Sequence, residues 1–285
     1  MASPRKELLA QAEERLCRYQ EQTPRDDTVV ALGAFLDYLR PDGRDNLCRN
    51  IIECDGDDER LYQLGQHLVE VLLHPSKCRL LTPVITPSHW FEVEEEVEEV
   101  ASTLVEDSAS LERDGYRCVV TKCFDHDYAL KQGSHFLETT VDTEAAHILP
   151  SALGADGNIH TLLRPSRETA KIWEVLYHLF PGIRSQLNFR PHMINDLSNV
   201  ITLESLLHAQ FGSFKFALEP TDTENVYRVK LYRGFPGLYK TGLPADGLVR
   251  FQSHDPPVPL PSRILLEAHA VLAQILHETG RGEIA

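Results

Sequence analysis

Three short segments, far apart in the chain, constrain the fold of this sequence more than its composition does. The first two have the apolar and β-branched content of short strands, and the third has the apolar spacing of a helix. They contain a histidine, an asparagine and a second histidine in that order: Ala145-Ala146-His147-Ile148-Leu149-Pro150, Asn199-Val200-Ile201-Thr202-Leu203 and Leu207-His208-Ala209-Gln210-Phe211. We expect the helix to run from Thr202, a candidate N-cap, to Phe211. The order strand, strand, helix predicts a small mixed core.

The residue types in these segments suit phosphodiester hydrolysis. The ordinary pKa of an imidazole is about 6.5, so a neutral ring at His147 can accept a proton from water near physiological pH. A second imidazole at His208 can ligate a divalent cation that faces a phosphate. Taken alone, His147 would be interpreted as an ordinary core or surface histidine. The two segments downstream, which contain Asn199 and His208, favour the catalytic interpretation instead.

A fourth segment precedes these three and completes the pattern. It is Leu111-Glu112-Arg113-Asp114-Gly115-Tyr116-Arg117-Cys118-Val119-Val120-Thr121. From about residue 111 to residue 218 the chain resembles a fungal-type HNH endonuclease domain of the ββα-metal superfamily, and the specificity lies in the combination of motifs. The resemblance implies an HNH nuclease, that is, a metal-binding endonuclease and hydrolase that acts on nucleic acid, DNA in preference to RNA, with little sequence specificity.

The resemblance also assigns roles to individual residues. His147 matches the family's general base and His208 its metal-ligating histidine. Asn199 matches an asparagine that either pins the strand pair by backbone hydrogen bonds or provides an oxygen ligand, and the first of these roles is favoured. Glu204 precedes His208 by one helical turn and could orient its ring, although such a pair is also ordinary on a helix surface.

The sequence departs from the family pattern at two positions. Ala146 stands where an acidic ligand usually precedes the base histidine, and Gly212 stands where an aspartate is frequent. Glu144 lies on the same strand face as Ala146 and is a candidate replacement ligand, although two strand residues span about 6–7 Å. Fewer oxygen ligands weaken a site for Mg²⁺ more than one for Zn²⁺ or Ni²⁺. The expected cofactor is therefore a divalent ion, with Mg²⁺, Mn²⁺, Zn²⁺ and Ni²⁺ all open.

The formal net charge of −15 opposes binding to a polyanion. Much of the acid is local, because residues 1–100 carry 11 Lys and Arg against 21 Asp and Glu. Between the first two motifs lies a basic stretch that predicts contacts to substrate phosphate through Arg164, Arg167 and Lys171. An ordinary solvated helix face is the alternative interpretation of this stretch.

The sequence predicts an α+β fold: a ββα-metal, HNH-like core with a long helical insertion, a helical N-terminal region, and a C-terminal hairpin plus helix. We expect residues 1–90 to form a helical accessory region and residues 91–285 the HNH-like domain. The apolar spacing predicts N-terminal helices at 5–19, 28–39 and 57–73, with Pro24, Pro41 and Pro75 as breaks. A long acidic helix is expected at 91–113. A solvent-facing surface is its ordinary role, and a protein partner on the acidic N-terminal half is the alternative.

The remaining elements follow from local patterns. We expect a short strand at 118–121, a loop or irregular strand at 124–139, a strand at 140–148, an inserted helix at 167–180, a hairpin at 214–218 and 226–232, and a final helix at 262–279.

No apolar run is long enough for a membrane span, no secretory core follows Met1, and the six cysteines are scattered. These features predict an intracellular protein, cytoplasmic or nuclear. Two other functions stay open beside the nuclease. One is an HNH-derived binding or regulatory module without cleavage activity, and the other is an HNH-derived enzyme for a small-molecule substrate.

Overall fold

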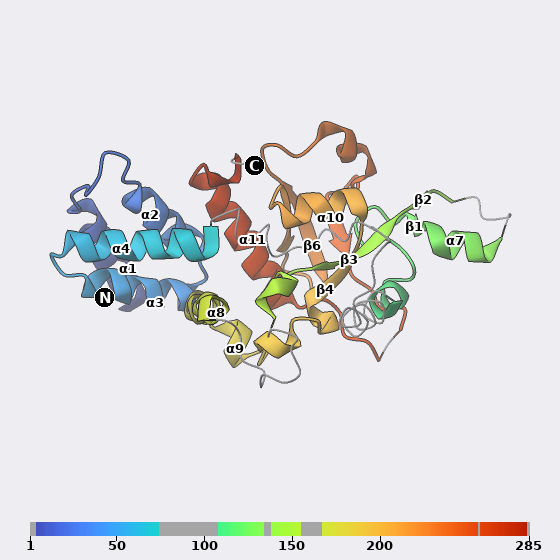
Figure 1. Cartoon of the computed structure of the whole chain (residues 1–285), viewed down its shortest axis with the longest axis horizontal. Coiled ribbons are helices and arrows are strands. Elements are labelled where there is room, and N and C mark those ends of the chain that lie inside the picture. Colours follow the sequence, from blue (N-terminus) through green and yellow to red (C-terminus); the bar gives the residue numbers. More distant parts are fainter. Residues whose placement is uncertain (1–3, 74–107, 134–137, 155–166, 256, 284–285) are drawn as a thin grey trace, which may run out of the picture. The chain divides into compact units, whose positions relative to one another are not determined.

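A computed structural model describes residues 4–73, 108–133, 138–154, 167–255 and 257–283. Helices and small sheets are both present in this part of the chain, as an α+β fold requires (Figure 1). The chain divides into two compact units. The first comprises Met1–Cys78, Ser166–Arg190 and Val271–Ala285, and the second comprises Arg79–Pro165 and Pro191–Ala270. The boundary predicted near residue 90, and most of the helix predicted at 91–113, lie outside the described residues.

The first unit is helical. Its elements are α1 (Pro4–Cys17), α2 (Thr28–Tyr38), α3 (Pro41–Glu53), α4 (Asp58–Leu68) with a π-helical extension (Val69–Leu73), α8 (Arg167–Leu179) and α9 (Gly182–Ser185). Helix α3 packs against α1 and α8. The contact with α8 requires glycine at position 43, because a Cβ atom there would lie 1.8 Å from the carbonyl oxygen of Leu179. The helical N-terminal region and the helix inside the insertion are therefore observed.

The second unit contains three small sheets. Its strands are β1 (Phe124–Asp125), β2 (Thr140–Val141), β3 (Thr143–His147), β4 (Val200–Glu204), β5 (Phe216–Pro220), β6 (Val226–Leu231) and β7 (Leu248–Arg250). Strands β1 and β2 pair in parallel, β3 and β4 pair antiparallel, and β5, β6 and β7 form an antiparallel sheet. Its helices are α7 (His126–Gln132) and α10 (Ser205–Gly212). Helix α11 (Arg263–Glu278) contributes residues to both units. The predicted C-terminal hairpin and helix are thus confirmed, and β7 adds a third strand.

A buried ion pair holds the strand that bears the second motif. Arg113 is fully buried, and its Nε and Nη2 atoms each donate to one carboxylate oxygen of Asp114 at 2.8 Å. Its guanidinium also donates to the carbonyl oxygens of Leu197 at 2.7 Å and Val200 at 2.9 Å. The carboxylate of Asp114 accepts a bond from the amide of Thr202 at 3.1 Å. The pair therefore fixes the backbone just before and within β4.

Several local expectations are wrong. Pro41 does follow the end of α2 at Tyr38, but it also begins α3, a helix that the sequence pattern does not predict, because a proline fits the first turn of a helix. Residues 118–121 form a turn and no strand, closed by a 3.0 Å bond from the Lys122 amide to the Cys118 carbonyl. The segment 124–139 contains β1 and α7, and Asp125 caps α7 by accepting a bond from the Tyr128 amide at 2.8 Å.

Replacing Asp114 by asparagine should destabilise strand β4, because the buried guanidinium of Arg113 would lose its counter-charge. We expect the free energy of opening of β4 to fall by about 3–5 kcal/mol, measured by native-state hydrogen exchange of its amides. Glu138→Gln is the matched control, since it removes an exposed partner of Arg117 and should cost less than about 1 kcal/mol. Equal protection of β4 in the two variants would contradict an anchoring role for the buried pair.

Candidate active site

Helix α10 lies against strands β3 and β4 and carries His208 (Figure 1). The helix buries Leu207 and Phe211, which are four residues apart and therefore share a face. The side chain of His208 follows Leu207 in sequence and keeps 23% of its exposure. Burial of one apolar face thus presents His208 at the edge of the strand pair.

Glu144 of β3 contacts His208 directly. Its Oε2 atom lies 2.5 Å from Nδ1 of His208, and half of the Glu144 side chain is exposed. The bond to His208 lowers the pKa of Glu144, and a bond to Ser205 acts in the same direction against the effect of burial. Glu144 is therefore an ionised carboxylate at neutral pH. An anionic oxygen and an imidazole nitrogen converge here from a strand and a helix.

His147 ends strand β3 and contacts Asn195. Its Nε2 atom lies 3.2 Å from Oδ1 of Asn195. Burial lowers the pKa of His147 below its ordinary value, the bond to Asn195 offsets part of that effect, and the nearby His208 lowers the pKa further. The ring of His147 is therefore neutral at physiological pH, which is the protonation state that a general base requires.

The donor set for a cation is small. The two imidazoles are near enough to interact electrostatically, while strand alternation directs Glu144 and His147 to opposite faces of β3. Within the part of the chain that the structure describes, no group of three or more His, Cys, Asp or Glu side chains is arranged to hold a metal ion. The Glu144–His208 pair offers one oxygen and one nitrogen. An ion held by this pair would take its other ligands from water and phosphate oxygens.

Asn199 is buried, and both ends of its amide bond to backbone. Its Oδ1 atom accepts from the amide of Leu149 at 2.8 Å. Its Nδ2 atom donates to the carbonyl oxygens of Leu149 at 2.9 Å and Ile194 at 2.8 Å. These bonds join the end of β3 to the segment that leads into β4. The geometry favours the pinning role of Asn199 over the role of a metal ligand.

Two interpretations around α10 are wrong. Thr202 is a buried residue inside β4, and Glu204 occupies the N-cap position of α10. Because Glu204 has an extended backbone at that position, its side chain does not share a helical face with His208. Its carboxylate accepts a bond from the Thr121 hydroxyl at 3.1 Å instead. The carboxylate beside His208 is that of Glu144.

Asn195 is a site residue that sequence reasoning misses. The dipeptide Asn195-Asp196 is typical of a turn, and that explanation accounts for the residue types without any contact to His147. The side chain of Asp196 does accept a bond from the Ser198 amide at 2.9 Å, as in such turns. The turn therefore also serves to bring the Asn195 amide to the imidazole.

The predicted substrate-binding residues lie in another part of the chain. Arg164, and the side chain of Arg167 at the start of α8, lie outside what the structure describes. Lys171 lies on α8 and lines a cavity of the first unit. The histidines belong to the second unit. A contact of these three basic residues with substrate phosphate stays a prediction.

Comparison with known families identifies the segment that holds the site. Residues 118–219 match the family model described as HNH endonuclease. Residues 118–219 are therefore an HNH endonuclease domain. The match contains β3, β4 and α10 with Glu144, His147, Asn199 and His208. It confirms the resemblance to an HNH endonuclease domain, whereas the fungal type and the ββα-metal core stay predictions. No curated protein and no solved structure matches the chain.

HNH endonucleases act on nucleic acid and generally use a divalent metal ion, so nuclease chemistry is the activity that this domain suggests. Of the two departures from the family pattern, Ala146 is fully buried on β3, two residues after Glu144, and Gly212 is the last residue of α10. Among the described helices of the chain, none is long and apolar enough to cross a membrane.

Asn199→Ala should weaken the HNH domain, because the buried backbone groups of Leu149 and Ile194 would lose their partners. We expect a loss of about 2–3 kcal/mol in unfolding free energy, measured from the urea dependence of hydrogen exchange in β3. Gln252→Ala, which removes an exposed amide in the same unit, should leave that value within about 0.5 kcal/mol of the parent. An unchanged Asn199→Ala protein would show that the pinning bonds contribute nothing.

Proposed function

We propose that the chain is a metal-dependent nuclease of the HNH type that hydrolyses phosphodiester bonds with His147 as general base. The observation that carries the proposal is the direct contact between Glu144 and His208 inside the segment that matches HNH endonucleases. This contact supplies an oxygen donor two residues away from the position that Ala146 leaves without one. The strand pair β3–β4 and helix α10 serve, in this proposal, as the ββα-metal core.

His147 activates water in the proposed reaction. With Nε2–H donating to Oδ1 of Asn195, the lone pair on Nδ1 of His147 takes a proton from water. The water oxygen forms a bond to phosphorus, the bond from phosphorus to the leaving oxygen breaks, and that oxygen takes a proton from solvent. Asn195 is a positioning residue, because it acts through the orientation of the ring.

Glu144 and His208 would hold the divalent ion. Such an ion supplies electrostatic stabilisation of the charge that develops on the phosphate oxygens and the leaving group. Oε2 of Glu144 and Nδ1 of His208 lie 2.5 Å apart. Because carboxylate and imidazole side chains hold a cation only in their deprotonated forms, we expect affinity for the ion to rise with pH. Asn199 takes no ligand role in this proposal.

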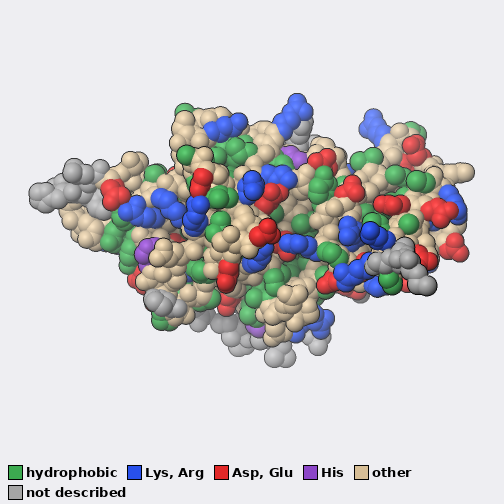
Figure 2. All heavy atoms as spheres, turned by 180° about the vertical axis from the view of Figure 1, so that it is seen from behind, with side chains coloured by type: hydrophobic (Ala, Val, Ile, Leu, Met, Phe, Trp, Pro, Cys, Tyr) green, Lys and Arg blue, Asp and Glu red, His purple; other side chains and the backbone are tan. Residues whose placement is uncertain are grey.

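The charge of the protein shapes its substrate preference. Figure 2 shows Lys and Arg side chains interspersed with Asp and Glu side chains on one face of the molecule. The formal net charge of the chain is −15, so we expect it to bind nucleic acid weakly and in a salt-sensitive way. The contacts would be to the phosphate backbone, with little recognition of base sequence. DNA is the favoured substrate. A protein partner on the acidic N-terminal half and an intracellular location stay predictions.

The second candidate function is an HNH-derived binding module that does not cleave. It is favoured by Ala146 and by the small donor set around His208 in the described residues. Its signature would be a protein that binds neither Mn²⁺ nor Zn²⁺ and leaves DNA and RNA intact with every divalent ion supplied.

His147→Ala should lower the rate of plasmid cleavage by about 10²–10⁴-fold, the usual contribution of a general base. In the parent protein the pKa of His147 lies below its ordinary value, so the neutral base persists above that lowered pKa. Activity is lost as the pH falls through it, below about pH 6.5. The measurement is the pH dependence of the cleavage rate at saturating metal.

Asn195→Ala separates orientation from basicity. The bond to Asn195 raises the pKa of His147, so its removal should move the acidic limb of the profile to lower pH. The loss of orientation should also reduce the rate, by about tenfold. Gln252→Ala is the control and should match the parent in both respects. An acidic limb that does not move in Asn195→Ala, together with full activity of His147→Ala, would exclude His147 as the base.

His208→Ala and Glu144→Gln should each weaken Mn²⁺ binding in calorimetry by about 10-fold or more, because each removes one of two protein ligands. Glu138→Gln removes an exposed carboxylate of the same unit and should bind Mn²⁺ as the parent does. Should both site variants retain parental affinity, the ion would bind elsewhere and the Glu144–His208 pair would be structural.

A further inference from the structure

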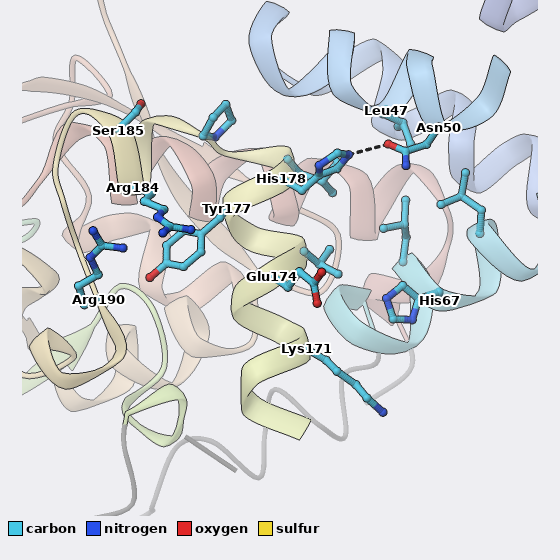
Figure 3. A pocket seen from close by; sticks show the side chains of 15 residues that line it. Leu47, Asn50, His67, Lys171, Glu174, Tyr177, His178, Arg184, Ser185 and Arg190 are labelled. Atoms are coloured by element: carbon cyan, nitrogen blue, oxygen red, sulfur yellow. Dashed lines mark hydrogen bonds between the residues drawn. The ribbon is translucent and has the colours of Figure 1, made fainter. Parts of the chain in front are cut away.

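The first unit contains a cavity that the nuclease proposal does not use. It has a volume of about 980 Å³ and is lined by residues of α3, α4, α8 and α9, and by Arg190 (Figure 3). Sites for small molecules typically measure about 300–1,000 Å³. Leu47, Leu68 and Val175 provide apolar lining. The cavity is therefore large enough for a nucleotide-sized molecule and offers it an apolar wall.

Two arginines at this cavity have neutral partners. The guanidinium of Arg184 lies 5.6 Å from the centroid of the Tyr177 ring. Nη2 of Arg190 donates to Oδ1 of Asn188 at 2.7 Å. The salt bridges found among the described residues include neither arginine. In a chain with 43 acidic residues, two guanidinium groups without a carboxylate partner in the described structure leave their charge available to an anion.

Tyr177 brings the two arginines into one site. Figure 3 shows Arg184 and Arg190 beside the ring of Tyr177. Burial raises the pKa of the Tyr177 hydroxyl, and the charges of Arg190 and Arg184 act in the opposite direction, as two adjacent cations must. The hydroxyl donates to the Phe189 carbonyl at 3.0 Å, and the ring packs on Trp173 with centroids 5.3 Å apart. The aromatic surface between the cations is thus fixed in place.

The wall formed by α3 and α8 carries polar side chains other than arginine. His178 Nε2 lies 2.6 Å from Oδ1 of Asn50, which ties α8 to α3. Glu174 is the carboxylate that lines the cavity, and it can accept a hydrogen bond from a hydroxyl or amino group. A ligand that binds both the arginines and Glu174 would carry an anionic group for the arginines and a neutral part with hydrogen-bond donors for Glu174.

We propose that this cavity binds a nucleoside monophosphate, with the phosphate between Arg184 and Arg190 and the nucleoside along the wall that bears Glu174. Arginine forks match the oxygens of a phosphate in geometry and charge. A ribose or a base supplies the donors for Glu174 and an apolar face for the leucine-lined wall. The volume of the cavity fits a single nucleotide, whereas the contacts of a nucleic-acid strand extend along a surface. The site is separate in sequence from the HNH residues and does not depend on the proposed cleavage.

The test is calorimetric titration of the full chain with the four ribonucleoside 5′-monophosphates, inorganic phosphate, adenosine, and a short single-stranded oligonucleotide without terminal phosphate. At least one monophosphate should bind about tenfold or more tightly than inorganic phosphate or adenosine. The double variant Arg184→Gln/Arg190→Gln should lose about 10–100-fold of that affinity. Arg25→Gln, an exposed arginine of the same unit outside the cavity, is the matched control and should bind as the parent does.

Further variants separate the parts of the proposal. Glu174→Gln should weaken the monophosphate and leave inorganic phosphate unchanged, and His147→Ala should not alter nucleotide binding at all. Thermal unfolding of each variant checks that it remains folded. The proposal is overturned if none of the monophosphates binds at millimolar concentration, or if the double variant binds them as the parent does. It is also overturned if the oligonucleotide binds more tightly than the monophosphates and loses affinity in the double variant.

Discussion

The buried ion pair between Arg113 and Asp114 is the contact on which the second unit depends. Besides reaching into β4, the guanidinium donates to the Pro259 carbonyl at 3.3 Å, and the Arg113 carbonyl accepts from the His254 amide at 2.8 Å. Segments that are distant in sequence therefore meet at one charged group. Replacing both Arg113 and Asp114 by apolar residues could preserve the stability of the unit, whereas replacing one of them would leave an unpaired charge in the protein interior. Gly115 allows this close packing, because a Cβ atom there would lie 2.8 Å from the His254 ring.

The position of the imidazoles follows from this anchor. Fixing β4 also fixes its register with β3, in which Val200 faces His147 and Leu203 faces Glu144. A slip of one residue would turn every side chain of β3 to the other face and would separate Glu144 from α10. Asn199 locks the open end of the pair, where the long insertion leaves and returns. The site is therefore assembled by backbone contacts of residues that carry no reaction chemistry.

The sequence predicts which elements carry the site residues, but it does not predict the detailed contacts between them. The three motifs predicted which strands and helix carry His147, Asn199 and His208, and strand alternation placed Glu144 on the face of Ala146. Contacts between residues far apart in the chain have no local signal. Asn195 reaches His147 across 48 residues, and its own neighbourhood reads as a turn. Helix α3 escapes prediction for a local reason, because Pro41 fits both a break after one helix and the first turn of the next.

In the proposed metal site the oxygen donor lies at position 144, whereas the family pattern has it at position 146. This difference alters the properties of the site. Position 146 is fully buried, and a carboxylate there would be ionised only with strong compensation from a cation. Glu144 is half exposed and paired with His208, so it is ionised without an ion. The two side chains are thus arranged without an ion, and an ion held by them would take its remaining ligands from solvent. A domain of this kind should hold its ion weakly, exchange it readily and depend on substrate phosphate to complete the coordination.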